Sequence, residues 1–186
     1  MDAISQAALG IGQWTSTQKH ALGFIWKEPA KFGVHGARTY MYVKFTLGSG
    51  AAGYDGSLVG FLATSTDALF NVAADISAVV PINTPCGVIR NTTGAAVTTN
   101  YYGWIQLIQP YEILKSVILS SDIGANSLAQ WAVDSYGDLL GAYVSTHEGV
   151  ILPFGVVLTG DPDGATALIS TQGYWDVLPV LNPYRT

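Results

Sequence analysis

The chain has 186 residues, of which only 11% are charged and 21 are glycine, so strands and turns are favoured over helices with charged faces. Gly, Ser, Thr and Asn interrupt every apolar run before it reaches the roughly 18 residues of a membrane-spanning helix, which excludes that class of membrane protein. The net charge of −5 divides into +3 over residues 1–44 and −8 over the rest, so the positive charge is too sparse to bind nucleic acid.

Residues 1–37 combine five glycines with several aromatic side chains and show no sustained periodicity. This pattern indicates an extended N-terminal arm, whose aromatic groups would be buried by adding a strand to another subunit. The alternative is that the segment folds back onto its own chain. The residues expected to contact another subunit, with the lysines adding electrostatic steering, are Trp14, Lys19, Phe24, Trp26, Lys27, Lys31 and Phe32.

The clearest strand covers residues 38–47, where Met41, Val43, Phe45 and Leu47 alternate with more polar neighbours. Further strands are predicted over 101–108 and 113–119. An Asp-Pro-Asp-Gly turn at 161–164 is predicted to join two strands, 156–158 and 167–169, into a hairpin. Only two segments, 67–80 and 123–133, are candidates for short helices.

Three sequence blocks recur in the same order when the chain is shifted against itself. Residues 57–69 match 127–139 at an offset of about 70, residues 85–89 match 153–157, and residues 102–105 resemble 173–177. Such a series indicates an internal duplication. The sequence therefore predicts a mainly β chain of two tandem small modules, each barrel-like or sandwich-like: an arm at 1–37, a first module at 38–110 and a second at 111–186.

Catalytic and ligand-binding patterns are absent from the sequence. The histidines His20, His35 and His147 lie in no recognisable nucleophile turn, and no pair of residues has a zinc-binding spacing. The single cysteine, Cys86, can form neither an internal disulfide nor a metal site alone. We therefore expect no enzymatic activity, no metal and no cofactor.

One alternative from a different functional class rests on acidic residues of the C-terminal half. Paired carboxylates beside an aromatic platform are typical of carbohydrate-active proteins. The candidates are Asp134, Asp138 and Glu148, with Trp131 or Tyr143 as the platform. Solvated turn residues are the simpler interpretation.

A family resemblance rests on five short stretches, residues 17–23, 36–45, 56–61, 87–89 and 101–107. They resemble small structural proteins encoded beside the major capsid gene of tailed bacteriophages, the head decoration or cement proteins. The resemblance implies a β-rich, oligomeric protein, a trimer or dimer, made in the host cytoplasm. It would bind the outer capsid surface and clamp neighbouring major capsid subunits. The alternatives of similar composition are a head fibre base and a tail-tube subunit.

Overall fold

The computed structural model describes residues 6–30, 37–46, 52–62, 69–74 and 86–109, together with strands at 113–118, 128–130, 153–157 and 166–170. These residues contain one short helix and ten strands, which confirms a mainly β fold. The elements are α1 (Gln6–Leu9), β1 (Ile25–Glu28), β2 (Arg38–Phe45), β3 (Leu58–Phe61), β4 (Asn71–Ala73), β5 (Gly87–Ile89), β6 (Tyr101–Leu107), β7 (Ile113–Ile118), β8 (Leu128–Gln130), β9 (Pro153–Val157) and β10 (Thr166–Ser170).

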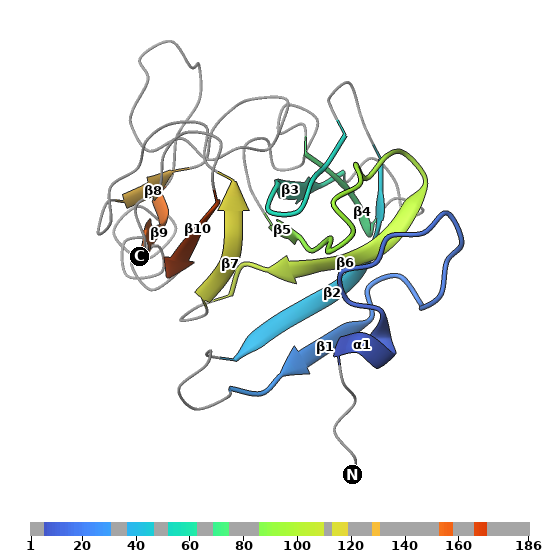
Figure 1. The fold of residues 1–186 in the computed structure, drawn as a ribbon, viewed down its shortest axis with the longest axis horizontal. Helices are drawn as coiled ribbons and strands as arrows, with labels where there is room; N and C mark the ends of the chain where they lie inside the picture. Colours follow the sequence, from blue (N-terminus) through green and yellow to red (C-terminus); the bar gives the residue numbers. More distant parts are fainter. Residues whose placement is uncertain are drawn as a thin grey trace, which may run out of the picture.

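The first six strands form a closed barrel with one extra strand. Their order is β1-β2-β4-β3-β5-β6, and a further pairing between β2 and β6 closes the ring of five (Figure 1). One edge of β2 serves two partners, because residues 38–41 pair with β1 whereas Lys44 and Phe45 pair with β4. The β2–β4 contact is parallel, and the other contacts in this sheet are antiparallel.

Apolar side chains from alternate positions fill the barrel. The inward residues of β2 include Val43 and Phe45, and those of β6 include Ile105 and Leu107, as expected for a small barrel whose interior is packed with side chains. The other buried members of this cluster are Trp14, Val59, Val72, Ala74, Ile89 and Val97. The period-two strands predicted over 38–47 and 101–108 are thus confirmed as β2 and β6.

Residues 6–28 lie along the outside of β2 and β6, apart from the Trp14 side chain, which enters the barrel. There they form a second buried cluster, whose members are Leu9, Tyr40, Tyr42 and Trp104, with Ile11, Leu22, Trp26 and Tyr102 packed against it. The prediction of an extended arm is therefore wrong for residues 6–28, which fold back onto their own chain. The aromatic outer face of β2 and β6 explains this, since covering it within one chain removes apolar surface from water without any cost of association.

The second sheet repeats the strand order of the barrel. Its order is β7-β10-β9-β8, which corresponds to β2-β6-β5-β3, with antiparallel neighbours throughout. Two cross-strand pairs of the barrel have counterparts in the second sheet. The pair Leu58–Val88 corresponds to Leu128–Val156, and the pair Val59–Gly87 corresponds to Ala129–Gly155. These are the positions that the sequence shift superimposes. The division at residue 110 into two modules stays a prediction. The third repeat block at 173–177 lies outside the described residues, and in the strand order it is β10, not that block, that takes the place of β6.

Both helix predictions are wrong at their centres. Residues 71–73 of the first segment form β4, and residues 128–130 of the second form β8. Each strand has only three residues, too few to show a period of two in the sequence. The strand predicted over 113–119 is confirmed as β7, and the predicted hairpin is confirmed by the antiparallel pairing of β9 with β10. The turn residues 161–164 lie outside the described residues.

Candidate interaction surface

Trp14 is part of the barrel core. It is 9% exposed, meets the ring of Phe45 edge-on at 6.2 Å between centroids, and donates its indole N–H to the Arg90 carbonyl at 2.8 Å. The inward position opposite Val43 on β6 is Gly103, where a methyl group would overlap the Trp14 indole. The predicted role of Trp14 in contacting another subunit is therefore wrong, because the side chain is enclosed by its own barrel.

His20 lies among three aromatic rings on the outside of the barrel. Its ring centroid is 5.0 Å from that of Tyr42, 5.5 Å from Trp104 and 5.9 Å from Phe24. The carbonyl of Leu9 lies 3.2 Å from His20 Nε2 and accepts the Trp104 indole N–H at 3.0 Å. His20 thus packs residues 6–24 onto β2 and β6, which is a structural role.

The inner face of β1 is held to β2 by aromatic stacking and a small ionic group. Trp26 stacks on Tyr40 with centroids 5.7 Å apart, and the Tyr40 hydroxyl donates to Glu28 Oε2 at 3.2 Å. Arg38 Nη1 lies 3.7 Å from the same carboxylate oxygen. Burial, together with the adjacent Glu28 carboxylate, raises the pKa of Tyr40 to about 12. The carboxylate of Glu28 is therefore engaged within the chain.

Exposed apolar and basic side chains lie on β1 and in the residues that precede it. Phe24 and Ile25 are 41% and 49% exposed, and they are adjacent in the chain, just after a turn in which Gly23 has a φ of 79°. Lys19 and Lys27 are exposed as well. We call Lys19, Phe24, Ile25 and Lys27 the β1 patch. It contains three of the residues predicted for subunit contact, and a fourth, Trp26, is half-buried against Tyr40.

Ile25 was missed by the sequence prediction, and two predicted residues are not tested. Ile25 alternates with Trp26 and precedes Lys27, so a strand assignment would have placed it beside Lys27 on one face. Because no strand was recognised in this segment, the prediction selected the larger aromatic residues instead. Lys31 and Phe32 lie outside the described residues.

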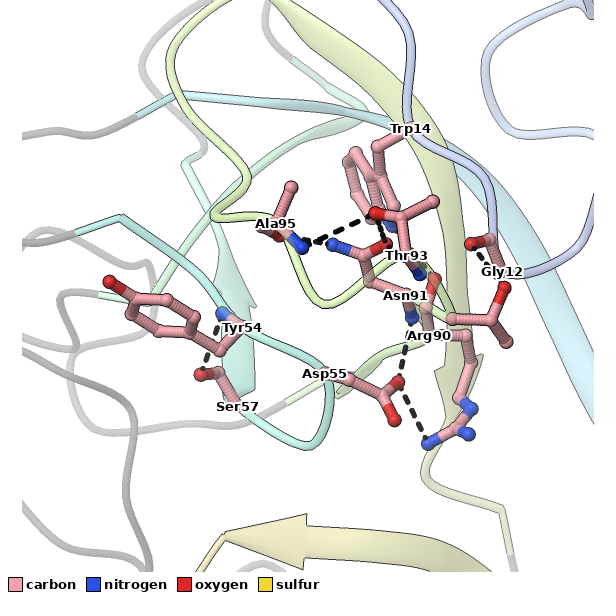
Figure 2. A network of polar contacts seen from close by, with 10 residues as sticks. Gly12, Trp14, Tyr54, Asp55, Ser57, Arg90, Asn91, Thr93 and Ala95 are labelled. Atoms are coloured by element: carbon pink, nitrogen blue, oxygen red, sulfur yellow. Dashed lines mark hydrogen bonds and ion pairs between the residues drawn. The ribbon is translucent and has the colours of Figure 1, made fainter.

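A separate polar network joins three loops at the end of the barrel where Trp14 enters. Figure 2 shows Asp55 Oδ1 accepting the backbone N–H of Asn91 at 2.7 Å and facing Arg90 Nη1 at 3.2 Å. The side-chain oxygen of Asn91 in turn accepts the backbone N–H and the hydroxyl of Thr93. Arg90 and Asn91 are buried, so their contacts hold the loops together.

No catalytic constellation occurs in the described part of the chain. Within it, no cluster of His, Cys, Asp or Glu could hold a metal ion. Burial raises the pKa of the Cys86 thiol, which opposes formation of a nucleophilic thiolate. The carbohydrate-site candidates, Trp131, Asp134, Asp138, Tyr143 and Glu148, lie outside the described residues. Among the helices that the structure does describe, none is long and apolar enough to span a membrane.

Comparison with known proteins gives a likeness to a solved structure. No protein-family model matches the sequence, and no curated protein matches it. The solved structure of the head fiber gp8.5 N base of bacteriophage phi29 is similar, with a TM-score of 0.47 and 14% identity. The match covers 72% of this chain and 93% of that one. A likeness of this size assigns neither a family nor a function.

Proposed function

We propose that the chain is a structural protein of a tailed-phage virion, which decorates the outer surface of the capsid and stabilises it by bridging neighbouring major capsid subunits. The sequence resemblance to decoration proteins motivates the proposal. The observation that carries it is the β1 patch, an apolar and basic surface held on a rigid barrel. The proposal assigns no reaction, metal or cofactor to the chain.

The chemistry of the β1 patch suits attachment to another protein. Exposed, adjacent Phe24 and Ile25 gain free energy when a partner removes them from water, and Lys19 and Lys27 favour a partner surface that carries carboxylates. Each contact of this kind is modest. When the contact is repeated over a shell, or within a dimer or trimer of the chain, the shell opens only if many contacts break together.

Co-sedimentation tests this function. Capsids of the phage that encodes the protein would be prepared without it and mixed with the purified full chain. The mixture would then be centrifuged at increasing salt concentrations. We expect saturable binding that weakens as salt rises, because lysines contribute to the contact. Capsids with bound protein should also withstand heating to a higher temperature than bare capsids. Absence of the protein from the capsid pellet at every salt concentration would overturn the proposal.

The position of the protein on the particle separates decoration from the other virion roles. Labelled protein spread over the whole capsid face supports decoration. Label confined to fibre attachment points or to the tail tube would instead indicate a head fibre base or a tail subunit, and would overturn the clamping role.

A further inference from the structure

We propose that β1 binds its partner by strand addition: an extended segment bearing carboxylates pairs with the outer edge of β1. The inference deepens the proposed function by naming how the capsid protein is held. The inference depends on the proposed function only for the identity of the partner. The chemistry that would recognise the partner is that of the β1 residues.

Among the described residues, one hydrogen-bonding edge of β1 has no strand partner. The Phe24 carbonyl accepts the Tyr42 N–H at 2.9 Å, so residues of the same parity on β1, Trp26 and Glu28, direct their backbone groups toward β2. The N–H and C=O groups of Ile25 and Lys27 therefore point away from β2. Within the described residues, no strand pairs with β1 on that side.

The side chains beside this edge define the partner. A segment paired with Ile25 and Lys27 would place its own side chains against one exposed apolar group and one exposed cation. The one carboxylate on β1, Glu28, contacts Arg38 and Tyr40. An extended strand with an apolar and an acidic residue two positions apart would place both on the face of Ile25 and Lys27, and so matches both features.

A second copy of the chain fits this edge poorly. A two-fold antiparallel pairing of two β1 edges would bring Lys27 of one copy close to Lys27 of the other, which is unfavourable. A lysine on an edge strand is also a common device against self-association. Lys27 can therefore oppose pairing between copies and still favour an acidic partner strand.

Two variants test the inference through capsid co-sedimentation. Ile25→Pro removes one outward N–H and leaves the hydrogen bonds to β2 in place, since proline is tolerated on an edge strand. Lys27→Glu reverses the charge facing the partner. We expect the first to weaken binding at least tenfold, and the second to weaken it several-fold and reduce its dependence on salt. Tyr54→Ser is the matched control, because Tyr54 is 48% exposed on another loop and its loss should leave binding unchanged.

Hydrogen exchange on the full chain supplies a readout that does not depend on affinity. In the wild-type complex, the amides of Ile25 and Lys27 should become protected, as paired strand amides are. Circular dichroism and urea unfolding of each variant would check that it is folded. If Ile25→Pro misfolds, amide protection in the wild-type complex still decides the question.

Four outcomes are distinguishable. If the wild-type chain does not bind capsids, the proposed function fails and the strand-addition mode fails with it. If it binds but the Ile25 and Lys27 amides stay unprotected, or if folded Ile25→Pro and Lys27→Glu bind as tightly as the wild type, only the strand-addition mode fails. The fourth outcome is protection of the same amides in the free protein that increases with protein concentration. That result would mean that a second copy occupies the edge, and it would also overturn the strand-addition mode.

Discussion

Trp14 and Gly103 are about 90 residues apart in the sequence, yet the small size of one explains how the large side chain of the other fits inside the barrel. The indole occupies the inward space that Gly103 leaves on β6, and its N–H is satisfied by the Arg90 carbonyl. A buried tryptophan needs both a cavity of its own size and a hydrogen-bond acceptor. Neither residue shows this relation in its local sequence, which is why Trp14 was predicted to contact another subunit.

Because of Tyr40, the free energy of unfolding should fall as the pH becomes strongly alkaline. Its pKa is raised from 10.0 to about 12 in the folded chain, so folding favours the neutral hydroxyl. Its contribution to the free energy of unfolding is complete below pH 10 and is lost as pH rises to about 12. Two pKa units correspond to roughly 3 kcal/mol. Urea unfolding at pH 8 to 12 would measure the loss.

Tyr40→Phe is the control for that prediction. It should cost about 1 kcal/mol at pH 8, because the hydrogen bond to Glu28 is lost, and it should then lose less stability than the wild type between pH 10 and 12. Part of the alkaline loss should remain in the variant, since burial also raises the pKa of Tyr42 and of Cys86. Parallel stability curves for the variant and the wild type would contradict the assignment to Tyr40.

At the scale of elements, residues 6–28 are joined to the barrel by backbone pairing as well as by side chains. The N–H of Thr15 donates to the Tyr102 carbonyl at 3.0 Å, and the N–H of Tyr102 donates back at 2.8 Å. Gly12 pairs in the same way with the loop after β5, since its carbonyl accepts the Thr92 N–H at 2.8 Å. The segment therefore behaves as an added layer of the barrel and not as a tether.

Replacing Thr15 tests this layer. Thr15→Pro removes the N–H that donates to Tyr102 and leaves that carbonyl without its partner, so we expect a loss of about 1 to 3 kcal/mol in the free energy of unfolding. Thr15→Ala keeps the backbone pair and removes only an exposed hydroxyl bond to the Thr17 carbonyl, so its effect should stay within about 0.5 kcal/mol. Urea unfolding followed by tryptophan fluorescence measures both. Equal effects of the two substitutions would show that the backbone pair contributes little.

The elements that could be predicted from the sequence are those whose residue pattern is visible within one short segment. β2 and β6 have seven or eight residues and alternate visibly, and the β9–β10 pairing followed from a strong turn motif between two apolar runs. β4 was missed because its parallel partner, β2, lies more than 20 residues earlier and its own three residues show no period. Of the candidate surface, the lysines and Phe24 were found because they are polar or large. Ile25 required knowledge that β1 is an edge strand.

At the scale of the whole molecule, the matching strand orders suggest how the second sheet should be organised. In the barrel, the Ile89 N–H donates to the Ser57 carbonyl, so the neighbouring pair Leu58–Val88 is of the non-hydrogen-bonded type, with closely spaced Cα atoms. Leu128 and Val156 are the corresponding pair in the second sheet. The repeat therefore predicts close Cα spacing there as well.

Engineered cysteines test that register. The double variant Leu128→Cys with Val156→Cys should form a disulfide under mild oxidation, because non-hydrogen-bonded antiparallel pairs have suitable spacing. Gln130→Cys with Val156→Cys is the off-register control and should remain reduced. Cys86 should not compete, since its buried thiol resists ionisation. Mass spectrometry after thiol labelling would distinguish the two results, and efficient crosslinking of the control would contradict the register.

Closure of the barrel between β2 and β6 has a consequence for synthesis on the ribosome. Residues 38–45 find their longest partner only in residues 101–107, and the acceptor of the Trp14 indole N–H lies 76 residues downstream. Until that stretch has left the exit tunnel, the nascent chain lacks Trp104 and the acceptor for Trp14, so both aromatic clusters are incomplete. We therefore expect the barrel to complete its folding late in synthesis, because β6 completes the surface on which residues 6–28 pack.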